Sequence, residues 1–188
     1  MTTLTRTALD ALCIPRAHRS TDVDWRDLEA HLAREAEVGL DINPDYQRGH
    51  VWTPAQQVAY VEHILLGGET AREVMTVCVG RGTDDYVTAR DGSISLRRYS
   101  LLDGLQRVTA VRAFVADAFP VLTSVDPAGF RWSQLDRSIQ RRDLSFSWRS
   151  LAVPTEADVI RLYLRLNSGG TPHSAAELDR VRAMLVTS

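Results

Sequence analysis

The chain contains no lysine, although it is 188 residues long and carries 22 basic side chains, all of them arginine. A Walker A loop needs a lysine at the phosphates, and a Schiff-base enzyme or a lysyl-adenylate ligase needs a lysine nucleophile. The absence of lysine excludes these classes of site. Anions must instead be bound by arginine, whose guanidinium group suits bidentate recognition of phosphate or carboxylate.

Cysteine is scarce, and metal-ligand spacing and long hydrophobic runs are missing. The only cysteines, Cys13 and Cys78, lie far apart, and the five histidines show no ligand spacing, so neither a disulfide framework nor a zinc site is expected. No run approaches the roughly 18 apolar residues of a membrane span, and residues 1–19 lack a signal-peptide core. We therefore expect a cytoplasmic protein with no membrane partner. The net charge of −2 gives no overall basic field to attract nucleic acid.

Length and composition indicate one globular domain, because 44% of the residues are hydrophobic and 24% are charged. We expect residues 1–21 to form a loose N-terminal arm and residues 22–188 to form the domain. Apolar spacing predicts helices over 22–38, 53–66, 104–115, 133–140, 155–166 and 174–185, and strands over 74–79, 86–89 and 94–102. The continuous apolar run of 74–79 is typical of a central strand, and the turn at 90–93 predicts a hairpin.

The turn Asp103-Gly104 lies between a predicted strand and a predicted helix. Such a turn presents free backbone N–H groups and the positive end of the helix dipole, which together favour a phosphate. The same residues also fit a capping box, with Asp103 as N-cap and Gln106 three residues later, which needs no ligand. Arg107 falls on the flank of the helix that faces the core. It therefore needs an anionic partner, either a carboxylate of this protein or a phosphate.

Two further segments combine polar and aromatic side chains. The loop 43–52 includes Tyr46, Arg48 and Trp52, and exposed loops of this kind often bind ligands. The alternative is that Tyr46 and Trp52 pack in the protein and Arg48 is solvated. The second segment interleaves basic and aromatic residues, which is typical of nucleic-acid binding and equally of a strand with one buried face. Its members are Trp132, Arg137, Arg141, Arg142, Phe146, Trp148 and Arg149.

Three blocks of the sequence, taken together, resemble a known family. They read PDYQRGHVW at 44–52, LDGLQRVTA at 102–110 and LRLNSGGTP at 164–172. In this order and spacing they resemble the N-terminal domain family of GmrSD-type restriction endonucleases, a branch of the ParB/sulfiredoxin-like fold, over residues 22–188. The family usually reads Asp-Gly-Gln-Gln-Arg at the centre, whereas this chain has Leu105 at the third position and keeps the glycine, the second glutamine and the arginine.

The resemblance implies a single α+β domain, a small mixed sheet with flanking helices, in which nucleotide phosphates lie against the Asp-Gly turn. It implies hydrolysis of a nucleoside triphosphate with Mg²⁺ or another divalent ion, in DNA restriction, DNA modification or phage counter-defence. Nuclease chemistry in such systems commonly belongs to a separate HNH domain, and this chain shows no such cluster. We therefore expect a nucleoside triphosphate as ligand, weak DNA binding by the chain alone, and a separate nuclease or modification subunit as partner.

The residues expected to carry this activity come from the same blocks. Gly104 lets the backbone approach phosphate oxygens, and Arg107 and Arg48 neutralise phosphate charge. Asp103 caps the helix or holds Mg²⁺, and Gln106 positions a water for attack on the γ-phosphate. The other candidates for nucleotide binding are Tyr46, Gln47, Thr109, Arg165 and Asn167.

Two other functions fit the same residues. The first is a ParB-like DNA nickase or nuclease that uses Asp103 with a metal ion. The second is a non-catalytic subunit that has kept the fold without turnover, which the Leu105 departure favours. Because duplex binding depends on neutralising phosphates with basic residues, we expect the isolated chain to bind DNA weakly, with steep salt dependence, and not to cut both strands.

Overall fold

The computed structural model describes residues 17, 19–47, 49, 51–69, 71–79, 86–88, 94–96, 99–140, 144–167 and 175–187. The strands of this part of the chain are β1 (Arg19–Asp24), β2 (Leu40–Asp41), β3 (Glu73–Val79), β4 (Tyr86–Thr88), β5 (Ile94–Leu96), β6 (Tyr99–Asp103) and β7 (Ser145–Val153). The helices are α2 (Leu28–Glu37), α3 (Pro54–Leu65), α4 (Leu105–Val115), α5 (Arg137–Gln140), α6 (Glu156–Asn167) and α7 (Ala175–Thr187), with short 3₁₀ helices η1 (Trp25–Asp27) and η3 (Trp132–Gln134). None of these helices is long and apolar enough to cross a membrane.

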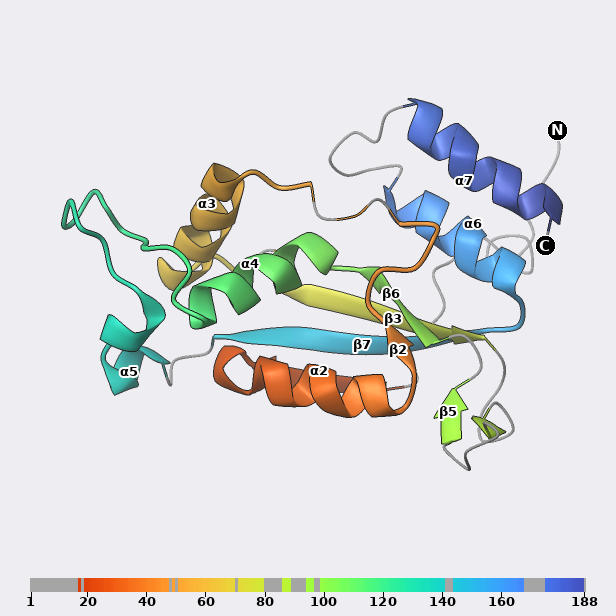
Figure 1. Cartoon of the computed structure of the whole chain (residues 1–188), viewed down its shortest axis with the longest axis horizontal. Helices are drawn as coiled ribbons and strands as arrows, with labels where there is room; N and C mark the ends of the chain where they lie inside the picture. The colour runs from red at the N-terminus through yellow and green to blue at the C-terminus, as the bar shows by residue number, and fades with distance from the viewer. Residues whose placement is uncertain are drawn as a thin grey trace, which may run out of the picture.

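Five strands form one mixed sheet in the order β1-β7-β3-β6-β2 (Figure 1). The central strand β3 pairs in parallel with β7 and antiparallel with β6. The edge strand β1 is antiparallel to β7, and β2 is parallel to β6. The prediction of a central strand at 74–79 is confirmed. Its side chains from Val74 to Val79 are nearly all buried, as expected of a strand that is covered on both faces.

Two hydrophobic clusters hold the helices to the sheet. The first joins α2, α3, α4 and η1 through residues such as Trp25, Phe114 and Trp148. The second joins α6 and α7 to the sheet through Leu151 and Val153 of β7. Figure 1 shows α2 and α6 on opposite sides of the sheet. The domain is therefore a single α+β unit with helices on both faces of a mixed sheet, as the sequence predicts at this coarse level.

The predicted helix over 22–38 is wrong at its start. Residues 19–24 form β1 and pair with residues 145–150 of β7, so the helix α2 begins only at Leu28. Hydrogen bonding to a distant strand outweighs the local helical pattern here, and Val23 and Trp25 enter the core. Residues 19–21, predicted as part of the loose arm, belong to this strand, and residues 1–16 lie outside the described part of the chain.

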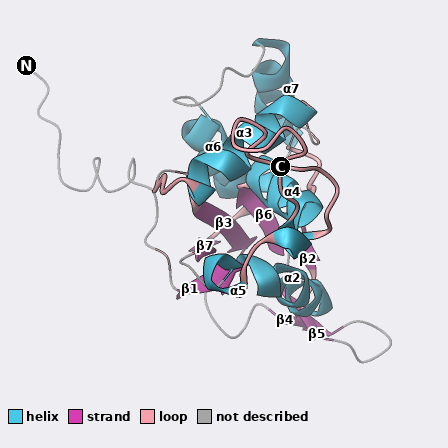
Figure 2. Cartoon of the chain, turned by 90° about the vertical axis from the view of Figure 1, so that its left-hand side faces the viewer, coloured by secondary structure: helices cyan, strands magenta, loops and turns pink. Residues whose placement is uncertain are grey.

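The hairpin predicted around residues 90–93 is confirmed, because β4 and β5 pair antiparallel. The predicted strand 94–102 is divided, however, into β5 and β6. Figure 2 shows β4 and β5 beyond the end of the five-stranded sheet, while β6 belongs to the sheet itself. The strand that leads into the Asp103-Gly104 turn is thus short, and its side chains from Tyr99 to Leu102 are buried.

Candidate functional site

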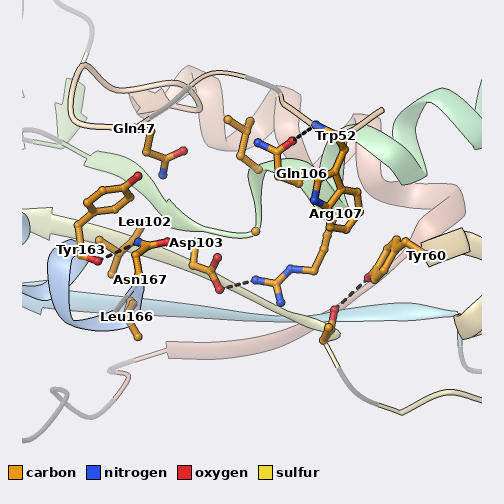
Figure 3. A pocket seen from close by; sticks show the side chains of 13 residues that line it. Gln47, Trp52, Tyr60, Leu102, Asp103, Gln106, Arg107, Tyr163, Leu166 and Asn167 are labelled. Carbon is orange, nitrogen blue, oxygen red and sulfur yellow. Dashed lines mark hydrogen bonds and ion pairs between the residues drawn. The ribbon is translucent and has the colours of Figure 1, made fainter. Parts of the chain in front are cut away.

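A pocket of about 390 Å³ opens where β6 runs into α4 (Figure 3). Segments distant in the sequence meet there: the loop before α3, α3 itself, the β6–α4 turn and the end of α6. The lining residues are Gln47, Trp52, Tyr60, Ala71, Leu102, Asp103, Gly104, Leu105, Gln106, Arg107, Tyr163, Leu166 and Asn167. Of the candidates derived from the sequence, six therefore line one pocket: Gln47, Asp103, Gly104, Gln106, Arg107 and Asn167.

Gly104 lines this pocket and is the N-cap of α4. Its φ of 109° lies in the left-handed region that L side chains rarely adopt. A Cβ at this position would lie 3.1 Å and 3.2 Å from the two methyl carbons of Val74. The predicted capping box with Asp103 as N-cap is therefore wrong. The N–H groups of residues 105–107 have no intrahelical acceptor because they lie in the first turn, and glycine has no side chain that could cap them.

Arg107 and Asp103 form an ion pair across the start of α4. The Arg107 Nη2 donates to Asp103 Oδ2, and the two side chains are 16% and 40% exposed. One of the two partners that the sequence left open for Arg107, a carboxylate of the protein, is therefore observed in Asp103. Among the described residues the other N–H groups of this guanidinium have no hydrogen-bond acceptor. They remain available to an anionic ligand in the pocket.

Gln106 is bonded to the loop that precedes α3. Its Oε1 accepts hydrogen bonds from Val51 N (2.9 Å) and Trp52 N (3.1 Å), and its Nε2 donates to Gly49 O (3.1 Å). Both lone pairs of the amide oxygen are used by these bonds. Gln106 is therefore an anchor of the loop in this structure.

Trp52 and Tyr60 form the aromatic end of the pocket. Their ring centroids lie 5.4 Å apart with an interplanar angle of 55°. The Tyr60 hydroxyl donates to Ala71 O (3.0 Å), and burial raises the pKa of Tyr60 to about 12. Tyr60 therefore stays neutral and acts as a fixed wall. Sequence reasoning missed it, because a tyrosine in an amphipathic helix carries no local signal of a ligand site.

The other end of the pocket is formed by Gln47, Tyr163 and Asn167, as Figure 3 shows. The Gln47 side-chain amide donates to Leu101 O, and Asn167 Nδ2 donates to Tyr163 O (2.8 Å). Helix α7 supports this end, because Arg180 Nη1 donates to Asp45 O (2.8 Å). The third sequence block thus reaches the pocket through Asn167.

Four candidates are not among the residues that line the pocket. Tyr46 is buried, with its hydroxyl 2.8 Å from Ser100 Oγ and its ring centroid 5.1 Å from that of Tyr163. It therefore attaches the loop to β6 and α6. The Thr109 hydroxyl donates to Leu105 O within α4 (2.8 Å). Arg165 lies on α6 and does not line the pocket. Arg48 lies outside the described residues, so its predicted convergence with Gly104 and Arg107 stays a prediction.

The described residues contain no group of three or more His, Cys, Asp or Glu that could hold a metal ion. Asp103 is the single carboxylate among the described residues that line the pocket, and it is already paired with Arg107. Mg²⁺ keeps several waters and is usually bound by one or two carboxylates together with substrate phosphates. The donor set therefore fits a metal ion carried by a phosphate ligand, and it does not form a cage for a metal alone.

The basic-aromatic segment is divided among three elements: Trp132 begins η3, Arg137 begins α5, and Phe146, Trp148 and Arg149 lie in β7. Phe146 and Trp148 of β7 are buried in the core, and Arg149 Nη1 pairs with Glu73 Oε1 at 2.9 Å. Over residues 146–149 this fits the alternative of one buried face and one partly exposed face, whereas Leu151 and Val153 further along β7 are buried against the second cluster. Arg141 and Arg142 lie outside the described residues.

Comparison of this chain with family models, with curated proteins and with solved structures found no match. The geometry of the pocket and the three sequence blocks that form it are therefore the basis for inferring its function.

Proposed function

We propose that this chain binds a nucleoside triphosphate in the pocket at the β6–α4 turn. The observation that carries this proposal is the convergence of Arg107, the uncapped start of α4 and the glycine turn on one pocket. Helix N-termini attract phosphate through their free N–H groups and their dipole. A guanidinium group adds charge-assisted hydrogen bonds to phosphate oxygens. The volume of about 390 Å³ falls within the roughly 300–1,000 Å³ of small-molecule sites.

The charges of the pocket support an exchange of anions on Arg107. Among the described residues that line the pocket, Arg107 is the one cation and Asp103 the one carboxylate. The pair is partly exposed, and ion pairs of this kind contribute little stability, about 0–1 kcal/mol. A triphosphate brings several negative charges to the same guanidinium and to the N–H groups of α4. We expect it to compete successfully with a single carboxylate.

The ParB/sulfiredoxin-like assignment and the role in DNA restriction, modification or phage counter-defence rest on the three sequence blocks. Within that context Mg²⁺ would arrive with the triphosphate, next to Asp103. A second candidate, a nucleotide-binding module without turnover, is favoured by one observation: the Gln106 amide is engaged by the loop at Gly49, Val51 and Trp52. The site then lacks the residue expected to position a water.

Calorimetric titration with ATP, GTP and CTP in the presence of Mg²⁺ tests the binding proposal. Replacement of Arg107 by alanine should weaken affinity about 10- to 100-fold, because a hydrogen bond to a charged group contributes about 1.5–3 kcal/mol. Arg112→Ala is the matched control: Arg112 lies on the same helix but pairs with Glu29, with Nε 2.5 Å from Oε1, outside the pocket. Equal affinity in both variants would reduce Arg107 to an internal ion-pair partner.

Phosphate release and plasmid integrity in the same samples separate the candidate activities. Release of phosphate with Mg²⁺ indicates hydrolysis, and tight binding without release indicates a module without turnover. Metal-dependent nicking or cutting of plasmid that disappears in Asp103→Ala would instead favour the nuclease.

A further inference from the structure

The aromatic end of the pocket is held from several directions. Trp52 is half-buried, lines the pocket and lies with its ring centroid 5.4 Å from that of Tyr60. Tyr60 is itself fixed by its hydrogen bond to Ala71 O (3.0 Å) and belongs to the hydrophobic core. An indole ring that is partly exposed beside a pocket presents a flat apolar surface, which a flat aromatic ligand can cover.

The backbone on both sides of Trp52 is also fixed. On one side Gln106 bonds to Gly49 O, Val51 N and Trp52 N. On the other side Thr53 begins α3 with a complete capping box, in which its hydroxyl accepts from Gln56 N and its own N–H donates to Gln56 Oε1. The indole is therefore held in place before any ligand binds, which lowers the cost of ordering it on binding.

We infer that Trp52 is the stacking surface for the base of the bound nucleotide, and that Gln106 is the positioning residue that holds Trp52 there. The inference rests on the proposed function, since it uses Arg107 and the start of α4 for the phosphates. It assigns the second half of the ligand: an aromatic base rather than a free polyphosphate or a phosphorylated sugar. Every base has a stackable face, so the site distinguishes ligands with a base from those without one and discriminates weakly among bases.

The test compares ATP with inorganic tripolyphosphate, which carries the charge without the base. Titrations use the full chain and the variants Trp52→Leu and Trp52→Phe. Stacking of one base on an aromatic side chain is strong enough that Trp52→Leu should weaken ATP binding about tenfold or more, with tripolyphosphate affinity unchanged. Trp52→Phe keeps an aromatic face and should retain most of the ATP affinity. ATP should quench part of the tryptophan emission of the unmodified chain, which has four tryptophans, whereas tripolyphosphate should not, and Trp52→Leu should lose this quenching.

The role of Gln106 is tested by a double-mutant cycle. Gln106→Leu removes the bonds to the loop and should reduce ATP affinity about as much as Trp52→Leu. If Gln106 acts through Trp52, Gln106→Leu should reduce ATP affinity little further once Trp52→Leu is present. The loss of affinity in the double variant is then well below the sum of the two single losses. Full additivity would mean that Gln106 contacts the ligand independently, and it would overturn the positioning role. Circular dichroism of each variant confirms that the fold is retained.

Failure of the inference is distinguishable from failure of the proposed function. If the unmodified chain binds ATP and tripolyphosphate equally, and Trp52→Leu changes neither, the phosphate site stands and the base site is refuted. Should the variant lose its fold, equal affinities in the unmodified chain together with unquenched emission refute the base site on their own. If the unmodified chain binds neither compound, the nucleotide site and the base site are both refuted.

Discussion

Gly104 is the residue whose replacement tests the geometry of the pocket most directly. Its φ is 109°, and a Cβ would lie 3.1 Å and 3.2 Å from the methyl carbons of Val74 and 3.3 Å from its Cα. Val74 is fully buried at the centre of the sheet, so it has little room to move. Gly104→Ala therefore combines a strained backbone with a steric clash, and both should lower the free energy of unfolding.

The expected loss follows from these two contributions. A left-handed conformation costs an L residue about 1–2 kcal/mol, and reduced freedom of the unfolded chain returns about 0.4–1 kcal/mol. Crowding against a rigid core side chain adds about 1–3 kcal/mol. Gly104→Ala should thus lose about 2–3 kcal/mol of stability. Gly67 is the matched control, because its φ is 94° and a Cβ there would have no atom of the described residues within 4 Å; Gly67→Ala should lose only about 1 kcal/mol.

Urea unfolding of the two variants, at constant m-value, measures both numbers. The variant Gly104→Ala/Val74→Ala adds a check on the contact. Since shortening Val74 relieves the clash, the double variant should lose less stability than the sum of the single losses. Equal losses for Gly104→Ala and Gly67→Ala would refute the reasoning, because the contact with Val74 would then contribute nothing.

Two further predictions concern charged groups. Burial lowers the pKa of His31 from 6.5; the charges of Arg34 and Arg19 lower it further, and the charge of Glu35 opposes the shift. Below about pH 6.5 the unfolded chain therefore binds a proton that the folded chain excludes. The free energy of unfolding should fall as the pH is lowered from about 7.5 to about 5.5. Urea unfolding at both pH values should show a smaller fall in His31→Gln. Asp103→Asn should tighten tripolyphosphate binding in the absence of Mg²⁺ and weaken binding of Mg-ATP, as measured by calorimetry.

The features that the sequence predicts correctly are those with local causes. Helix α3 begins at the capping box of Thr53 and Gln56, with proline at its first position, and these residues specify a helix start without reference to the rest of the chain. The same holds for Thr155, whose hydroxyl accepts from Asp158 N (3.2 Å) at the start of α6. The buried strand β3 is identifiable by its uninterrupted β-branched and apolar residues.

The features that sequence reasoning misses depend on distant parts of the chain. Strand β1 exists because it pairs with β7, more than a hundred residues later, and no pattern within residues 19–24 reports that partner. Trp52 and Tyr60 are close in sequence, but the pocket that they border forms only where the β6–α4 turn and the end of α6 meet them. The spacing of Gln106 from Asp103 fits both a capping and a catalytic role. Only the fold shows that its amide is bonded to the loop at Gly49.

Asp103 is the residue for which the sequence supports two roles and the structure supplies a way to separate them. Its carboxylate lies against Arg107, the group proposed to receive the ligand phosphates. Without a metal ion, the Asp103 carboxylate competes with phosphate for the Arg107 guanidinium and repels the phosphate. Removing the Asp103 charge should therefore increase tripolyphosphate affinity about threefold or more. With Mg²⁺ present, a carboxylate beside the phosphates is a ligand for the ion, and Asp103→Asn should weaken Mg-ATP binding. The two effects have opposite signs, so one variant titrated in two buffers decides the matter. Tighter binding under both conditions would mean that Asp103 only competes for Arg107, and the metal role would have to be abandoned.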